Sequence, residues 1–206
     1  MTQARPYGGV DAADRLARRR ASLLEAGLEL LGSNVDPAEL TVRGICRQAG
    51  VATRYFYESF TDKDEFVGAV FDSVVAGLAA TTQAAVAAAP AAEQNRAGVA
   101  NIVRSVEQDP RIGRLLFSAQ ISNPTVVRKR QGLGPLFAML GGQHVETTLN
   151  VPADDRIKAF ANFVVGGVGQ TISGWLAGDV GLTPAELVDQ ITAMIDGVGA
   201  TGVLRD

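Results

Sequence analysis

The segment from Leu40 to Lys63 limits most strongly what this chain can fold into. It predicts two short helices, over about 41–48 and 52–59, that meet at Ala49-Gly50-Val51. The glycine allows the positive φ that a sharp turn between two helices requires. Apolar residues at helical spacing predict that both helices pack on each other and on a helix that precedes them. This arrangement is a helix-turn-helix.

The rest of the chain has helical periodicity and no strand alternation of any length. Leucines form one stripe of a first helix over 14–31. After the helix-turn-helix, helices are expected from Thr61 toward Ala89 and over about 93–107, 110–120, 124–148 and 153–178. A capping box at Thr183-Pro184-Ala185-Glu186 begins a last helix. The sequence therefore predicts an all-α fold, with an N-terminal arm and three-helix helix-turn-helix domain over 1–62 and a second helical domain over 63–206.

Composition excludes several classes of protein. The 206 residues are 47% hydrophobic, which is too apolar for a disordered chain. Cys46 and His144 are the only residues of their kinds, so neither a disulfide framework nor a His/Cys metal cluster can form within one chain. We interpret Cys46 as a small buried hydrophobe rather than a redox group. The first residues lack a secretory signal, so a cytoplasmic protein is expected. No metal and no cofactor are expected either.

Two uncharged stretches, 73–92 and 159–178, are each 20 residues long, which is enough in principle to span a bilayer. Both carry polar residues near their centres. We therefore interpret them as buried or interface helices and expect no membrane contact.

The sequence shows no catalytic motif. G-x-S-x-G, Walker and H-E-x-x-H patterns are absent, and Gly167-Val168-Gly169 lacks the strand that precedes a dinucleotide loop. The carboxylates are scattered. We expect no enzyme and assign no catalytic residue.

Charge is unevenly distributed along the chain. Residues 1–63 hold nine Lys and Arg against eight Asp and Glu, and residues 64–206 hold ten against fourteen, which together give the net charge of −3. Four arginines cluster early in the chain, at Arg15, Arg18, Arg19 and Arg20. Such a cluster is either a solvated helix face or a strip that contacts phosphates, and the cluster alone does not decide between them.

The second helix of the helix-turn-helix leaves polar and aromatic side chains exposed, namely Thr53, Arg54, Tyr55, Tyr57 and Ser59. An arginine such as Arg54 can pair bidentately with guanine in the major groove. Thr41 and Lys63 begin helices, where free backbone N–H groups suit phosphate. These features favour DNA over the alternative, a helical protein-interaction module without sequence-specific DNA binding.

The same segment resembles the DNA-binding domain of TetR-type transcriptional regulators. The match is carried by Thr41, Ile45, Ala49, Gly50, Val51, Tyr57, Phe60 and Lys63. The resemblance implies DNA contacts from Thr41, Arg43, Thr53, Arg54, Tyr55, Tyr57 and Lys63, to which we add Arg19 from the basic cluster. The chain departs from the family pattern at Gly44, Cys46, Arg54-Tyr55 and Glu58, so the operator sequence is not predictable.

The resemblance further implies that the last two long helices form a four-helix interface in a homodimer. Glycines in the stretch 159–178 favour close approach of another helix, although packing within one chain is the alternative. The predicted interface residues are Phe163, Gly167, Gly174, Trp175 and Gly178.

The resemblance also implies that the second domain binds an effector. Residues on inward-looking helix faces are the candidate lining of its site: Phe71, Val75, Ile102, Phe117, Phe137, Met139 and Phe160. A lining of this kind suits a small hydrophobic molecule. The resemblance thus implies a bacterial, ligand-responsive regulator that binds an operator in double-stranded DNA and acts as a repressor that its effector releases.

Overall fold

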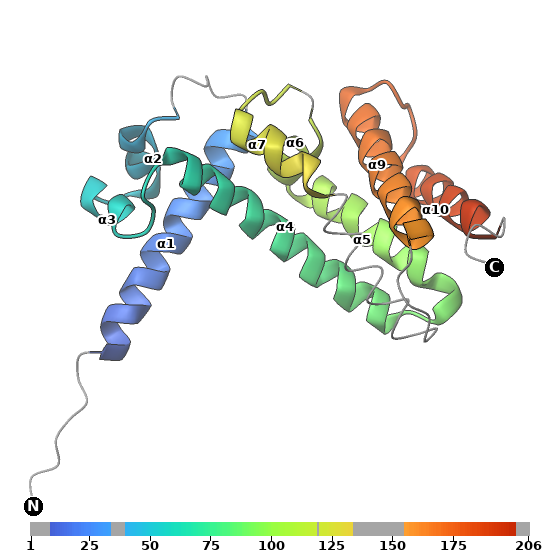
Figure 1. Ribbon diagram of the computed structural model, residues 1–206, viewed down its shortest axis with the longest axis horizontal. Helices are drawn as coiled ribbons and strands as arrows, with labels where there is room; N and C mark the ends of the chain where they lie inside the picture. Colours follow the sequence, from blue (N-terminus) through green and yellow to red (C-terminus); the bar gives the residue numbers. More distant parts are fainter. Residues whose placement is uncertain (1–8, 34–39, 119, 134–154, 201–206) are drawn as a thin grey trace, which may run out of the picture. The chain divides into compact units, whose positions relative to one another are not determined.

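The computed structural model describes residues 9–33, 40–118, 120–133 and 155–200, and all regular elements within these ranges are helical (Figure 1). The prediction of an all-α fold is confirmed. The α-helices are α1 (Gly9–Gly32), α2 (Val42–Ala49), α3 (Thr53–Tyr57), α4 (Lys63–Ala88), α5 (Gln94–Gln108), α6 (Pro110–Phe117), α7 (Pro124–Gln131), α9 (Asp155–Ala177) and α10 (Pro184–Ala200). A 3₁₀ turn, η2 (Ala91–Glu93), lies between α4 and α5.

The chain forms two compact units, residues 1–73 (the first unit) and 74–206 (the second unit). The boundary predicted from the sequence lies eleven residues earlier, where α4 begins. The first unit extends further because the first turns of α4 bury Phe66, Val67 and Val70. One continuous helix therefore supplies residues to both units.

The first unit has a densely packed aromatic core. Phe56 of α3 is fully buried, and its ring centroid lies 5.6 Å from that of Phe60 and 5.4 Å from that of Phe66. Helices α1 and α4 approach closely at Gly27, because a Cβ atom there would lie 2.6 Å from Cζ of Phe66. The leucine stripe of α1 contributes Leu23, which is also fully buried. The interior of this unit is thus well filled.

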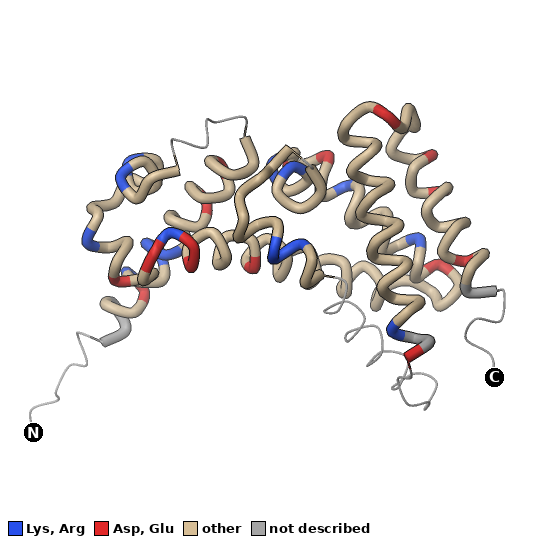
Figure 2. Tube along the Cα trace, turned by 45° about the horizontal axis from the view of Figure 1, so that its top comes forward, with Lys and Arg blue, Asp and Glu red and all other residues tan. Residues whose placement is uncertain are grey.

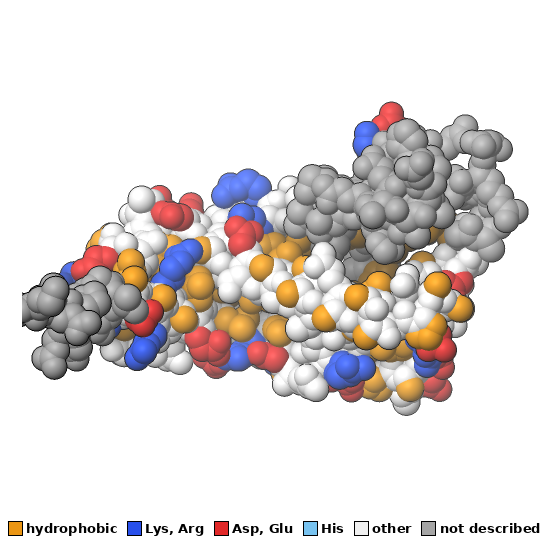
Figure 3. Space-filling model, turned by 90° about the horizontal axis from the view of Figure 1, so that it is seen from below, with side chains coloured by type: hydrophobic (Ala, Val, Ile, Leu, Met, Phe, Trp, Pro, Cys, Tyr) orange, Lys and Arg blue, Asp and Glu red, His pale blue; other side chains and the backbone are white. Residues whose placement is uncertain are grey.

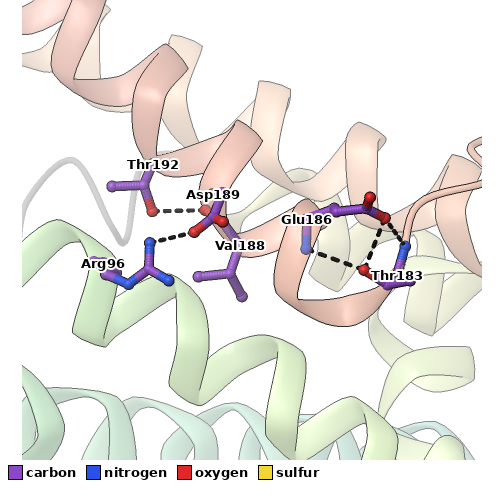
Figure 4. Close-up of polar contacts among 6 residues, drawn as sticks. All are labelled: Arg96, Thr183, Glu186, Val188, Asp189 and Thr192. Carbon is purple, nitrogen blue, oxygen red and sulfur yellow. Dashed lines mark hydrogen bonds and ion pairs between the residues drawn. The ribbon is translucent and has the colours of Figure 1, made fainter.

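The second unit is centred on contacts of α5 with α10 and of α6 with α5 and α9. Its buried apolar cluster consists of Val99, Val103, Ile172, Leu187, Val188 and Ile191. Figure 4 shows the start of α10, where the backbone N–H of Thr183 donates to the Glu186 carboxylate (2.8 Å) and the N–H of Glu186 donates to Oγ1 of Thr183 (3.3 Å). An ion pair between Arg96 of α5 and Asp189 of α10 lies beside this cap. The predicted capping box is confirmed.

The two uncharged stretches are not buried in the second unit. No side chain of α4 between residues 73 and 88 is buried, and Ile172 is the one buried side chain among those described in α9. Hydrophobic side chains lie at the surface over the second half of α4 (Figure 3). Among the described helices, α4 alone has the length and apolar composition of a membrane span, which is weak evidence for one.

Candidate DNA-binding surface and effector cavity

The turn between α2 and α3 is built as the sequence predicts. Oγ1 of Thr41 accepts a hydrogen bond from the backbone N–H of Gly44 at 3.0 Å, which caps the N-terminus of α2. Gly50 ends α2 in the left-handed region, with φ of 66°. The N–H of Val51 then donates to the carbonyl of Cys46 at 3.0 Å. A side chain at residue 50 would be strained, so glycine fixes the direction in which α3 leaves.

Helix α3 has one buried and one exposed face. Phe56 is fully buried, whereas Thr53 and Arg54 are exposed and Tyr57 keeps 60% of its surface exposed. Cys46 of α2 is buried, and burial raises the pKa of its thiol. This environment agrees with the interpretation of Cys46 as a small packing residue. The exposed face of α3 therefore contributes little to packing in the first unit, apart from the edge contact of the Tyr57 ring with Phe56, whose centroids lie 5.4 Å apart.

Arg19 and Arg54 converge on the ring of Tyr55. The guanidinium carbon of Arg19 lies 3.7 Å from the ring centroid, and that of Arg54 lies 4.6 Å from it. Nη2 of Arg54 donates to the Tyr55 hydroxyl at 2.5 Å, and this bond is the main reason that the pKa of Tyr55 is lowered. Arg19 also lies 3.6 Å from the carboxylate of Glu58. The negative charge of Glu58 thus has a cationic partner on α1.

The start of α4 differs from what a phosphate site requires. Oδ1 of Asp62 accepts from the N–H of Glu65 at 2.8 Å, and the Glu65 carboxylate accepts from the N–H and the hydroxyl of Thr61 at 2.7 and 2.6 Å. The two bonds from Thr61 lower the pKa of the Glu65 carboxyl. Carboxylates therefore occupy this N-terminus, and Lys63 offers an exposed side chain there rather than a free backbone site.

All eight residues predicted to contact DNA lie in the described part of the first unit. Arg19 and Tyr55 are half-buried, and the other six are exposed: Thr41, Arg43, Thr53, Arg54, Tyr57 and Lys63. The structure brings Arg19, Arg54 and Tyr55 together. Sequence reasoning assigned these three side chains separately and missed their mutual contacts, because residues on α1 and α3 are brought together only by folding.

The second unit contains a cavity of about 770 Å³. Four predicted lining residues contribute to it, namely Val75, Ile102, Phe117 and Phe160. Phe71 does not line it and instead lies buried in the part of α4 that belongs to the first unit. Phe137 and Met139 lie outside the described residues. Leu78, which also lies on an inward-looking helix face by its spacing, lines the cavity too. Further apolar lining comes from residues that the sequence did not single out, including Val99, Leu116, Leu133, Val164 and Val168.

Arg130 of α7 also lines this cavity, and the sequence analysis missed it. Its Nε and Nη2 donate to the carbonyl of Leu115 at 3.0 and 2.6 Å, and its Nη1 donates to the carbonyl of Ser118 at 2.6 Å. Nη2 donates in addition to the carbonyl of Arg114 at 3.0 Å. The guanidinium thus caps the C-terminus of α6, where the helix dipole favours a cation.

An apolar groove of about 410 Å³ runs along α9 and α10. Phe163 lines it with 63% of its surface exposed, and a Cβ atom at Gly167 would meet nothing within 4 Å. The other predicted interface residues have partners or roles within the chain. Nε1 of Trp175 donates to the carbonyl of Leu182 at 2.9 Å, a Cβ atom at Gly174 would lie 3.3 Å from Cγ2 of Val180, and Gly178 has φ of 82°.

These features define a helix-turn-helix protein with a second, helical unit. Residues 23–70 match the family model described as bacterial regulatory proteins, tetR family. The chain therefore contains a region similar to the DNA-binding domain of TetR-family regulators. No curated protein sequence matches the chain.

Solved structures share the fold over most of the chain. A TetR-family regulator from Syntrophomonas wolfei is 13% identical with a TM-score of 0.72, over 92% of this chain and 99% of that one. A transcriptional regulator from Pseudomonas aeruginosa is 21% identical with a TM-score of 0.66, over 92% and 94%. FadR from Bacillus subtilis, solved in complex with stearoyl-CoA, is 15% identical with a TM-score of 0.62, over 85% and 96%. These proteins are transcriptional regulators, not enzymes.

Proposed function

We propose that this protein is a homodimeric, cytoplasmic repressor that binds operator DNA through its first unit and is released by a small, mainly hydrophobic effector bound in its second unit. The observation that carries the proposal is the exposed face of α3, on which Arg54 is held by Tyr55 within a TetR-type domain. Thr53, Arg54 and Tyr57 of this face are exposed to solvent.

In the proposed complex α3 enters the major groove. Arg54 pairs with a guanine, and Thr53 and Tyr57 contact neighbouring base edges or phosphates. The bond to the Tyr55 hydroxyl restricts Arg54 before DNA arrives, so less side-chain entropy is lost on binding. Arg19, Arg43, Thr41 and Lys63 bind the phosphate backbone and fix the register of the protein.

The groove along α9 and α10 supports the proposed dimer. Phe163 and Met194 leave 63% and 46% of their surfaces exposed there, and a second copy of α9 and α10 would cover them. A two-fold dimer presents two α3 helices to half-sites about 34–36 Å apart. Sedimentation of the wild type and of Phe163→Glu tests this part, because a buried charge would dissociate the dimer.

The cavity of the second unit supports an apolar effector. Its volume falls within the range of about 300–1,000 Å³ that small-molecule sites have, and most of its lining is apolar. A protein of similar fold, FadR from Bacillus subtilis, was solved in complex with stearoyl-CoA, and this supports an effector with a long apolar chain. Release from DNA requires that the effector bind better to a conformation that does not fit the operator. Helix α4 supplies residues to both units and is the proposed connection.

The test is a titration of labelled DNA from the upstream region of the protein's own gene, at two salt concentrations. The variant is Arg54→Ala, and its matched control is Arg104→Ala, which removes the same charge from an exposed site on α5. Loss of one good bidentate contact costs about 1–3 kcal/mol, so Arg54→Ala should weaken binding by about 5- to 150-fold while the control does not. Affinity should fall steeply with salt, since phosphate contacts release counterions.

Two outcomes would contradict the proposal. Binding that is indifferent to DNA sequence and to Arg54 would favour the alternative, a helical protein-interaction module. If molecules that bind in the cavity do not change the affinity for the operator, the proposal of DNA binding stands but the proposed response to an effector is wrong.

A further inference from the structure

Arg130 is the one charged side chain among the described residues that line the cavity. The rest of this lining is apolar or carries neutral polar groups, such as Gln94, Asn162 and Ser173. The cavity wall therefore places a single cation beside a mainly hydrophobic space. Nothing in the family resemblance or in the proposed function assigns a role to this cation.

Hydrogen bonds fix the guanidinium of Arg130 in place and use all but one of its N–H donors among the described residues. A guanidinium carries five N–H donors, and the bonds to the carbonyls of Arg114, Leu115 and Ser118 use four of them. One N–H on Nη1 has no acceptor among the described residues. Because the helix end fixes the plane of the guanidinium, an incoming acceptor would meet a preorganised partner.

No carboxylate neutralises Arg130 within the described part of the chain. Burial lowers the pKa of Arg130, and no acidic neighbour opposes that shift. The bonds to carbonyls satisfy its donors but supply only the partial charge of a helix end. A purely apolar ligand would displace water from the cavity and leave the cation less solvated than before.

The surrounding sequence strengthens the positive charge. Residues 110–133, which include α6 and α7, contain no Asp or Glu, and Figure 2 shows Lys and Arg in the last turn of α7. The cations of this segment are Arg111, Arg114, Arg128, Lys129 and Arg130. Asp109 precedes the segment, and both of its oxygens accept from Arg111. This segment is cationic although the chain as a whole carries a net charge of −3.

We propose that the effector is an anionic amphiphile, whose carboxylate or phosphate head binds Arg130 while its apolar body lies against Val75, Ile102 and Phe160. This inference rests on the proposed function, because it takes the cavity as the effector site. It goes further by naming the chemical class of the effector and the residue that selects it.

The test compares three probes with the same apolar chain: dodecanoate, dodecyl phosphate and dodecanol. Calorimetric titration should show that the wild type binds at least one anionic probe about 10- to 100-fold more tightly than dodecanol, the range expected for hydrogen bonds between charged groups. The relative affinity of dodecanoate and dodecyl phosphate then identifies the preferred head.

Arg130→Gln should bind all three probes with the affinity that the wild type has for dodecanol. Its unchanged affinity for dodecanol would show that the cavity is still formed. Arg128→Gln is the matched control, since it removes a charge from the same helix but not from the cavity lining, and it should keep the preference for anions. If Arg130→Gln does not fold, Arg130→Lys replaces it. This variant should show a preference for the anionic probes over dodecanol that is weaker than that of the wild type, because an ammonium keeps the charge but lacks the paired N–H donors of a guanidinium.

Three results would overturn the inference. Equal affinity of the wild type for dodecanol and both anions would remove the anionic head but leave a hydrophobic effector in place. A preference for anions that persists in the Arg130 variant would remove the role of Arg130. Failure of all three probes to bind would exclude this class, whereas the DNA titration would still decide whether the protein is a regulator of its operator.

Discussion

The two units of this protein use their interiors in opposite ways. The first unit fills its interior with aromatic rings, and its candidate functional side chains are at the surface. The second unit keeps a cavity of about 770 Å³, and one of its long helices, α9, buries a single described side chain. A densely packed unit is suited to hold the candidate DNA-binding residues in fixed positions, whereas a unit with internal space can bind a ligand and change conformation. The contrast predicts that equivalent substitutions have different effects in the two units.

The largest effect is expected from Phe56→Ala. Truncating a fully buried phenylalanine costs about 3–5 kcal/mol, because the aromatic cluster around it cannot close the hole. Tyr57→Ala is the control, since this side chain is 60% exposed and its loss should cost no more than about 1 kcal/mol.

The single tryptophan, Trp175, lies in the second unit and allows the two units to be followed separately during denaturation. In Phe56→Ala, part of the circular dichroism signal should be lost at low urea while the tryptophan fluorescence transition stays in place. Coincident early transitions by both probes would mean that the two units unfold as one.

The next effect is expected from a pair of glycine substitutions. Gly27→Ala places a Cβ atom 2.6 Å from the ring of Phe66, so overpacking of about 1–3 kcal/mol should exceed the gain in helix propensity. Gly167→Ala on α9 meets nothing within 4 Å and should stabilise the helix by up to about 1 kcal/mol. Urea unfolding of both variants measures the difference. Changes of opposite sign in the unfolding free energy would confirm the contrast in packing. A lower unfolding free energy of Gly167→Ala, measured on the monomer, would contradict it.

The first unit was more predictable from sequence than the second because its constraints are local. Gly50 requires a left-handed backbone, and Thr41 caps the helix that begins beside it, so both can be assigned from neighbouring residues. The packing of Arg19 on Tyr55 was not predictable, since it joins α1 to α3.

In the second unit, an apolar residue on a helix is compatible with a core, a cavity or an interface. Val75 and Phe71 have similar patterns, yet only Val75 lines the cavity. Arg130 lies in a short basic run that reads as a solvated surface, and only its bonds to α6 reveal its position. The prediction that Gly178 lies in a dimer interface stays a prediction, and its φ of 82° adds a conformational role at the end of α9 that the sequence analysis did not assign.

A smaller effect is expected at Asp109, which caps α6 in the second unit. Its Oδ1 accepts from the backbone N–H of Arg111 at 3.1 Å and from Nε of the same residue at 2.9 Å. The Arg111 side chain is the main reason that the pKa of Asp109 is lowered. At neutral pH, Asp109→Ala should cost about 1 kcal/mol, and Asp109→Asn should cost less because it keeps an acceptor.

The pH dependence of this effect has a definite sign. A carboxylate whose pKa is lower in the folded than in the unfolded protein stabilises the fold above the unfolded pKa of about 3.9 and loses that contribution as the pH falls below it. The difference in unfolding free energy between wild type and Asp109→Ala should therefore be constant from pH 7 to about pH 5 and shrink below about pH 4. A difference that stays constant below pH 4 would show that the cap does not depend on the charge.

The smallest effect on stability is expected at Glu58. Substitution of this residue nevertheless gives the most direct test of the proposed DNA-binding surface, which includes Arg19. Its contact with Arg19 at 3.6 Å is an exposed ion pair, so Glu58→Gln should change the unfolding free energy by no more than about 0.5 kcal/mol. Operator affinity should nevertheless increase, because the substitution removes a negative charge near the phosphates and frees the Arg19 guanidinium to bind one. Fluorescence anisotropy over a salt series should then show a steeper dependence, by up to about one unit in the slope of log K against log salt. Arg19→Gln is the matched opposite and should weaken binding and flatten the slope. Weaker binding by Glu58→Gln would instead mean that the carboxylate holds Arg19 in the orientation that DNA requires.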